Sequence, residues 1–265
     1  MTSSFHKRPW PWVLLALALV TSTLLALGIG RYWVAPQQVL TELLRLMSFQ
    51  SAFSQPDAVM TLQEKLVLHI RMPRVLTALC IGASLAMSGA ALQGAFRNPL
   101  VGPQILGISS GAALGGCLAI FFFSSMFAIL GTSFLGGIVA IAAVYALSRV
   151  GGKNQVLVLV LAGVVTGAFF GSLLSLLTYF SDPNETLPAI VFWLMGSFAT
   201  ASYVKLATVI GPIAVGMAVL YLLRFRINVL SMGDEHAASL GVAVEKVRWA
   251  LLACVALIVS SGVAI

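Results

Sequence analysis

Long apolar stretches without a single charged residue alternate along this chain with short segments that carry lysine, arginine, aspartate and glutamate. A helix crosses a bilayer with roughly 17–25 apolar residues, and each of these stretches is long enough to do so. The uncharged stretch 98–148 exceeds one crossing, so we place a turn at Ser124 and Ser125. The pattern predicts seven membrane-spanning helices, near residues 12–30, 75–95, 104–123, 126–148, 156–178, 205–223 and 248–265.

Two further apolar segments are too short to span. Residues 39–47 carry apolar side chains at helical spacing, which predicts a helix lying along the membrane surface. Residues 190–198 follow a turn-forming Ser-Asp-Pro-Asn sequence, so we expect a surface or re-entrant helix there.

Composition agrees with a membrane protein. Hydrophobic residues make up 60% of the 265 residues and charged residues only 9%, whereas soluble domains carry about 25% charged residues. The sequence therefore predicts an all-α polytopic transmembrane bundle, with residues 1–265 as a single membrane domain. The cysteines, Cys80, Cys117 and Cys254, lie in apolar stretches at no metal-ligand spacing, so we expect no metal site.

The distribution of basic residues predicts the orientation. With the N-terminus in the cytoplasm, the basic residues of cytoplasmic segments outnumber the acidic ones, and external segments are nearly balanced. This bias follows the positive-inside rule and explains the net charge of +7 without nucleic-acid binding. The cytoplasmic basic residues would be Lys7, Arg8, Arg97, Arg149, Lys153, Arg224, Arg226, Lys246 and Arg248.

Two series of glycines recur at exact four-residue spacing. Small residues in this register line one face of a membrane helix and allow close backbone approach. We therefore expect both faces to be helix contacts within the subunit rather than parts of a transport pathway. The two series are Gly107, Gly111 and Gly115, and Gly163, Gly167 and Gly171.

The chain offers no energy source of its own. Ion-coupled carriers usually need ionisable groups at membrane depth, and no such residue lies deep in a predicted span. Gly152 and Lys153 do not complete a phosphate-binding loop, because Leu147 stands where that loop needs glycine. If transport is active, we expect a separate partner ATPase, and neither enzymatic activity nor a cofactor in this chain.

The predicted cytoplasmic loop 224–247 contains a candidate docking element for such a partner. Ser231 and Asp234 form a start resembling a capping box, acidic side chains at 234 and 235 favour a helix N-terminus, and Gly241 can end the helix. A short helix over about 232–240 is predicted. We interpret it as a docking element rather than a plain solvated loop.

Three separated groups of residues resemble the signature of the FecCD family, the membrane permeases of ABC importers for iron–siderophore complexes, haem and cobalamin. The resemblance covers essentially residues 12–265. Its first group is Arg71-Met72-Pro73-Arg74, Gly82 to Gly89, Gln93, Asn98-Pro99-Leu100, Pro103, Leu106-Gly107 and Gly111-Ala112, and the others are Trp193 to Ser197 and Gly233 to Gly241.

The resemblance implies a permease subunit in the bacterial inner membrane that translocates an iron chelate of the siderophore type. Its implied partners are an ABC ATPase subunit that binds ATP and Mg, a periplasmic substrate-binding protein, a second permease copy or a paralogue, and membrane lipid. The family has ten spanning helices, of which seven are present, so we expect the chain to be truncated at its C-terminus, as a fragment of a longer reading frame or a degenerate product. A channel or ion-coupled carrier and a non-transporting scaffold remain alternatives, and haem, cobalamin or an oxyanion such as molybdate remain open as the substrate.

The resemblance also assigns roles to individual residues. Arg71 and Arg74 would meet carboxylates of the binding protein, although both could instead anchor the helix start at the lipid headgroups. The hydroxyl residues Thr166, Ser172, Ser175 and Thr178 would line the pathway, or could bond back to their own helix. The ATPase-docking loop would be Gly233, Asp234, Glu235, His236, Ala237, Ala238, Ser239, Leu240 and Gly241.

Overall fold

A computed structural model describes residues 10–47, 62–123, 125–150 and 155–265 of the chain. It divides into two compact units, and each is described by itself: residues up to Ala78 with Ala199–Tyr203, and Leu79–Phe198 with Val204–Ile265. Helices form the regular structure of the described residues, as predicted. The predicted turn residue Ser124 and the basic residues Lys7, Arg8 and Lys153 lie outside them.

The first unit contains the N-terminal helices. Its small apolar cluster brings together Leu27, Val34 and Val39 with Val67 and Leu68, all of them buried. Its elements are α1 (Trp10–Gly28), α2 (Pro36–Met47), α3 (Leu62–Lys65), the π-helix η3 (Leu66–Arg71) and the first residues of α4 (Met72–Phe96). The surface helix predicted from residue 39 begins earlier, because Pro36 fits the first helical position, which needs no backbone N–H.

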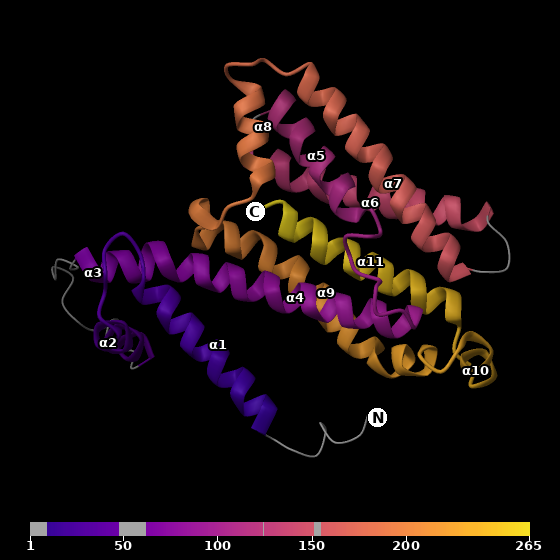
Figure 1. Ribbon diagram of the computed structural model, residues 1–265, viewed down its shortest axis with the longest axis horizontal. Coiled ribbons are helices and arrows are strands. Elements are labelled where there is room, and N and C mark those ends of the chain that lie inside the picture. The colour runs from indigo at the N-terminus through magenta and orange to yellow at the C-terminus, as the bar shows by residue number, and fades with distance from the viewer. Residues whose placement is uncertain (1–9, 48–61, 124, 151–154) are drawn as a thin grey trace. The chain divides into compact units, whose positions relative to one another are not determined.

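The second unit holds most of the spanning helices (Figure 1). It includes the remainder of α4 and nearly all of α9. The helices that follow α4 are α5 (Ile108–Phe122), α6 (Met126–Val150), α7 (Gln155–Tyr179), α8 (Thr186–Met195), the 3-10 turn η4 (Phe198–Thr200), α9 (Tyr203–Leu230), α10 (Asp234–Ser239) and α11 (Val244–Val263).

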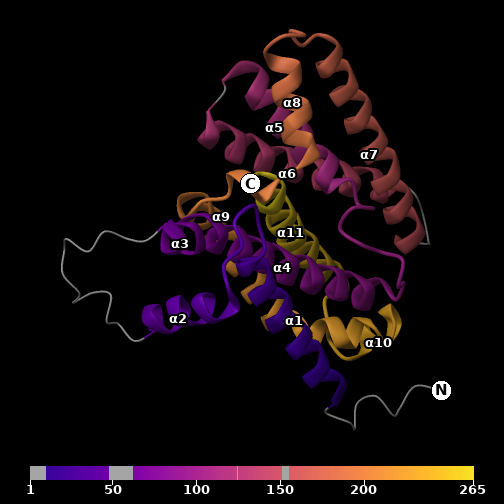
Figure 2. The same cartoon turned by 60° about the vertical axis from the view of Figure 1, so that its left-hand side comes forward.

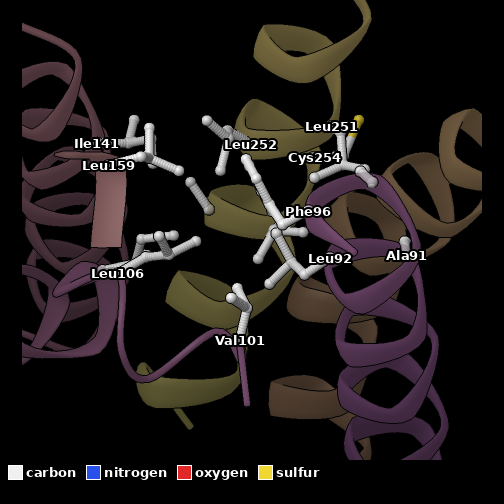
Figure 3. Close-up of a cluster of buried hydrophobic side chains, with 14 of the residues drawn as sticks. Ala91, Leu92, Phe96, Val101, Leu106, Ile141, Leu159, Leu251, Leu252 and Cys254 are labelled. Carbon is white, nitrogen blue, oxygen red and sulfur yellow. The ribbon is translucent and has the colours of Figure 1, made fainter. Parts of the chain in front are cut away.

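Helix α11 lies at the centre of the main core. Its Leu251 and Leu252 are fully buried and pack in one cluster with Leu92 and Phe96 of α4. Figure 3 shows these side chains meeting Ile141 of α6 and Leu159 of α7, with Val101 and Leu106 from the segment between α4 and α5. Helices from distant parts of the sequence therefore share one apolar core built around α11.

Among the described residues, six helices are long and apolar enough to cross a membrane: Trp10–Gly28, Leu66–Phe96, Met126–Ser148, Leu157–Tyr179, Tyr203–Leu230 and Val244–Val263. They coincide with six of the seven predicted spans. The second begins before residue 75, because α3, η3 and α4 follow one another without a break, so part of the predicted external loop is helical.

The remaining predicted span, 104–123, corresponds to a helix that is shorter than expected. Helix α5 has only 15 residues and begins at Ile108 rather than at residue 104. Gly107 precedes it with a left-handed φ of 69°, and the preceding chain is a turn in which the Asn98 side chain accepts a hydrogen bond from the Leu100 N–H at 2.9 Å. A left-handed residue cannot continue an α-helix, which explains the later start.

Helix α9 is longer than predicted and continues to Leu230, past Arg224 and Arg226. Charge had set the predicted end at residue 223, yet both arginines lie exposed on the helix. The Arg224 guanidinium carbon lies 3.9 Å from the centroid of the Tyr221 ring, within the range of a cation–π contact. Arginines at a membrane surface can thus extend a helix rather than end it.

Candidate functional site

The first glycine series allows α5 to touch α6. A Cβ added at Gly111 would lie 2.6 Å from the carbonyl oxygen of Gly136, and one at Gly115 would overlap the carbonyl of Thr132. Both obstacles are backbone atoms, which cannot move aside as a flexible side chain would. The two helices therefore approach each other more closely than any residue with a side chain permits.

The second glycine series, on α7, allows close packing against the segment that precedes α5. A Cβ at Gly163 would lie 2.5 Å from the carbonyl oxygen of Ile105, and one at Gly107 would lie 2.9 Å from the carbonyl oxygen of Gly163. The approach loosens along α7, since the corresponding contact of Gly167 is 3.5 Å and Gly171 has no atom within 4 Å. Close packing thus involves the start of this series and not its end.

The hydroxyl residues of α7 bond mainly to their own helix. Ser172 donates to the carbonyl of Ala168 at 2.9 Å and Ser175 to that of Gly171 at 3.1 Å. Thr178 donates to the carbonyl of Ser175 at 2.8 Å, whereas Thr166 is buried. Back-bonding, one of the two alternatives, therefore accounts for three of these hydroxyls, and their role as a pathway lining stays a prediction.

Arg71 is a buried residue of the first unit. Its guanidinium donates to the carbonyls of Leu27 and Gly28, each at 2.7 Å, and to that of Tyr32. These carbonyls lie at and beyond the C-terminus of α1, where a helix leaves carbonyls without backbone partners. A cation at this end also complements the helix dipole, so Arg71 stabilises the turn that follows α1.

Arg74 and Tyr203 make further long-range polar contacts within this unit. Arg74 donates to the carbonyl of Ala199 at 2.7 Å, and the Tyr203 hydroxyl donates to the carbonyl of Leu68 at 2.6 Å. Leu68 lies in the π-helix η3, where the backbone pairing departs from that of an α-helix. The contact of a binding protein with Arg71 and Arg74 stays a prediction. No pattern in the sequence indicated the π-helix or the contact of Tyr203.

The predicted docking loop contains a short helix, α10, which lies where the chain turns from α9 to α11 (Figure 2). The predicted capping role of Ser231 is wrong, because its hydroxyl bonds to the carbonyl of Asn228 and the helix begins only at Asp234. Gly233 stands at the N-cap with φ 122°, and Gly241 follows the helix with φ 78°. Both conformations favour glycine, so glycines define the two ends of this segment.

Helix α10 has an inner and an outer face. Ala237 is completely buried in the main core, and Asp234, one turn earlier, is half-buried on the same side. The remaining side chains are exposed, and Leu240, just beyond the helix, is 63% exposed. This outer face, which we define as Glu235, His236, Ala238, Ser239 and Leu240, combines one carboxylate with apolar and small polar groups.

The inner face carries an ionic contact that the sequence did not predict. The Asp234 carboxylate lies 2.7 Å from the guanidinium of Arg248 on α11 and 4.0 Å from that of Arg97, the residue after α4. The Arg248 guanidinium also lies 5.6 Å from the centroid of the Phe96 ring. The residue after α4 therefore meets the consecutive helices α10 and α11 at one carboxylate.

The described residues contain no group of three or more histidine, cysteine, aspartate and glutamate side chains that could hold a metal ion. The candidate site consists of a small helix with an exposed outer face, α10, and an ionic contact on its inner face.

Known proteins resemble this chain over nearly its whole length. The model of the FecCD transport family matches residues 17–265. The molybdate import system permease protein MolB of Haemophilus influenzae is 40% identical over 251 residues. A permease protein of Helicobacter pylori, assigned to an iron chelatin transport system, is 46% identical over 200 residues.

A solved structure shares the arrangement of the helices. It is described as an inward-facing conformation of a transporter assigned to the metal-chelate ABC type, and it matches with a TM-score of 0.80 at 39% identity. That match covers 97% of this chain and 76% of the other. The chain spans 72% of the Haemophilus permease and 60% of the Helicobacter permease, while 95% and 76% of this chain is covered.

Proposed function

The chain belongs to the FecCD transport family, and we propose that it is the membrane permease subunit of an ABC importer that translocates an iron chelate. The single observation that carries the proposal is the exposed outer face of α10, a helix whose inner face is anchored in the main apolar core of the protein through Ala237. A partner ATPase needs such a surface, because its movements must reach the spanning helices. ATP and Mg would be bound by that partner and not by this chain.

Two relatives support an iron chelate as the substrate class. The Helicobacter permease is named for iron chelatin and the matching solved structure for a metal chelate. Molybdate, named for the Haemophilus permease, is the competing substrate. Since uncharged helices offer few groups that recognise one chelate, we assign selection to a periplasmic substrate-binding protein that delivers the complex.

The proposed assembly lies in the bacterial inner membrane with the N-terminus of this chain in the cytoplasm. It pairs the permease with a second copy or a paralogue, and an ATPase dimer docks on α10 of each. ATP and the loaded binding protein would each favour one of two conformations of the pathway, so transport proceeds as a population shift between them.

The substrate assignment can be tested in the organism that carries the gene. Deleting the gene should reduce uptake of a radiolabelled ferric chelate to the level of energy-depleted cells, while molybdate uptake stays at the wild-type rate. A plasmid copy should restore ferric uptake. Loss of molybdate uptake with unchanged ferric uptake would contradict the iron-chelate assignment and favour an oxyanion importer.

A further inference from the structure

One buried arginine of α11 forms an ion pair with the docking helix. The Arg248 side chain is only 8% exposed, whereas that of Asp234 is 38% exposed. Their contact at 2.7 Å is a charge-assisted hydrogen bond, which is stronger than a bond between neutral groups. A buried guanidinium without its carboxylate would retain the cost of desolvation without the compensating attraction.

The end of α4 reaches the same carboxylate oxygen. Arg97 follows α4 with a φ of 52°, a left-handed conformation that is rare for a residue with a side chain. Its guanidinium lies 4.0 Å from the Asp234 oxygen that Arg248 also contacts. The preceding Phe96 is 4% exposed and places its ring beside Arg248, so α4 contacts both members of the ionic pair.

Helix α10 itself is too short to be stable alone. It has six residues, and isolated helices shorter than about 12–15 residues are marginal in water. On its inner face it is held by the buried methyl group of Ala237 and the ionic contact of Asp234. Glu235 and His236, the other titratable groups of this helix, lie on its exposed face.

We propose that Asp234 is a positioning residue that ties the docking helix α10 to the cytoplasmic ends of α4 and α11, and does not itself contact the ATPase. This inference rests on the proposed function for the role of α10, but the tie exists within this chain. Its consequence is mechanical: when α10 is moved, the carboxylate moves α4 and α11 with it. The outer face, with Glu235, would make the contact to the partner.

The tie can be tested on the permease alone by hydrogen exchange. The reporters are the N–H groups of Ala237, Leu240 and Val242, which bond to the carbonyls of Gly233, His236 and Ala237 at 2.8, 3.1 and 2.9 Å. Asp234→Asn should accelerate their exchange by about tenfold, because a charged hydrogen bond that holds the helix is lost. Asp234→Glu, which keeps a carboxylate, should restore part of the protection.

Glu235→Gln is the matched control, because it removes the neighbouring carboxylate from the outer face of the same helix. In this variant the three reporter N–H groups should exchange at the wild-type rate. Wild-type exchange in Asp234→Asn, or equal acceleration in both variants, would overturn the inference. Because this measurement needs no ATPase, its result is independent of whether the proposed function holds.

The transport consequence is measured in liposomes that contain the assembled importer. Asp234→Asn should lower the amount of chelate taken up per ATP hydrolysed, whereas Asp234→Glu should recover it in part. An unchanged ratio in Asp234→Asn would overturn the mechanical role. Absence of any ATPase from the wild-type preparation would contradict the proposed function instead. The hydrogen-exchange result alone would then show whether Asp234 connects α10 to α4 and α11.

Discussion

Alanine in place of Gly115 is expected to separate α5 from α6 and to cost about 3 kcal/mol or more of stability, the upper range for overpacking a core. The added methyl group would overlap the backbone carbonyl of Thr132, and no side-chain rotation can relieve that contact. Purified protein should melt at a markedly lower temperature or fail to elute as a single species in detergent. Thermal unfolding of the purified permease measures the effect.

The matched control is Gly171→Ala, at the last glycine of the second four-residue series. No atom lies within 4 Å of a Cβ at this position, so the added methyl group meets open space. Alanine has a better helix propensity than glycine, and the melting temperature should stay the same or rise slightly. Equal destabilisation by both substitutions would contradict the close approach described for α5 and α6.

Phenylalanine in place of Ala237 is expected to abolish recovery of the ATPase with the permease. Ala237 is completely buried on the inner face of α10, and this six-residue helix cannot accommodate an aromatic ring there without being displaced from the core. The spanning helices make most of the core and should stay folded. Co-purification of the ATPase from membranes, together with the elution profile of the permease, measures both consequences.

Ala218→Phe is the control for this substitution. It introduces the same ring on α9, where Ala218 is exposed. The permease should then retain its ATPase in wild-type yield. Full recovery of the ATPase with Ala237→Phe would show that the position of α10 against the apolar core does not matter for docking.

The spanning helices could be predicted because their physical cause is local. A charge-free stretch of sufficient length satisfies its backbone hydrogen bonds only as a helix in a bilayer, and six predicted spans match helices of sufficient length. The predicted ends of the helices were less accurate where something other than the distribution of charges determined them. At α5 the left-handed Gly107 delays the start, and at α9 exposed arginines extend the helix to Leu230.

The position of the docking helix in the chain could be predicted from the sequence, but the side that faces the core could not. The acidic residues at 234 and 235 and Gly241 indicated a short helix over about 232–240, and α10 (Asp234–Ser239) lies within these bounds. Which side of α10 faces inward depends on Arg97 and Arg248, which come from other helices. The same limit applies to Arg71, whose bonds to the carbonyls after α1 depend on long-range packing.

If an ABC ATPase docks on α10 of this chain, a native mass spectrum of the complex extracted mildly from its host's membranes should show both proteins together. We expect a dimer of permease subunits with a dimer of ATPase subunits, and expect the ATPase to be absent when the exposed Leu240 is replaced by aspartate. A wild-type permease that is recovered without any ATPase would contradict the account.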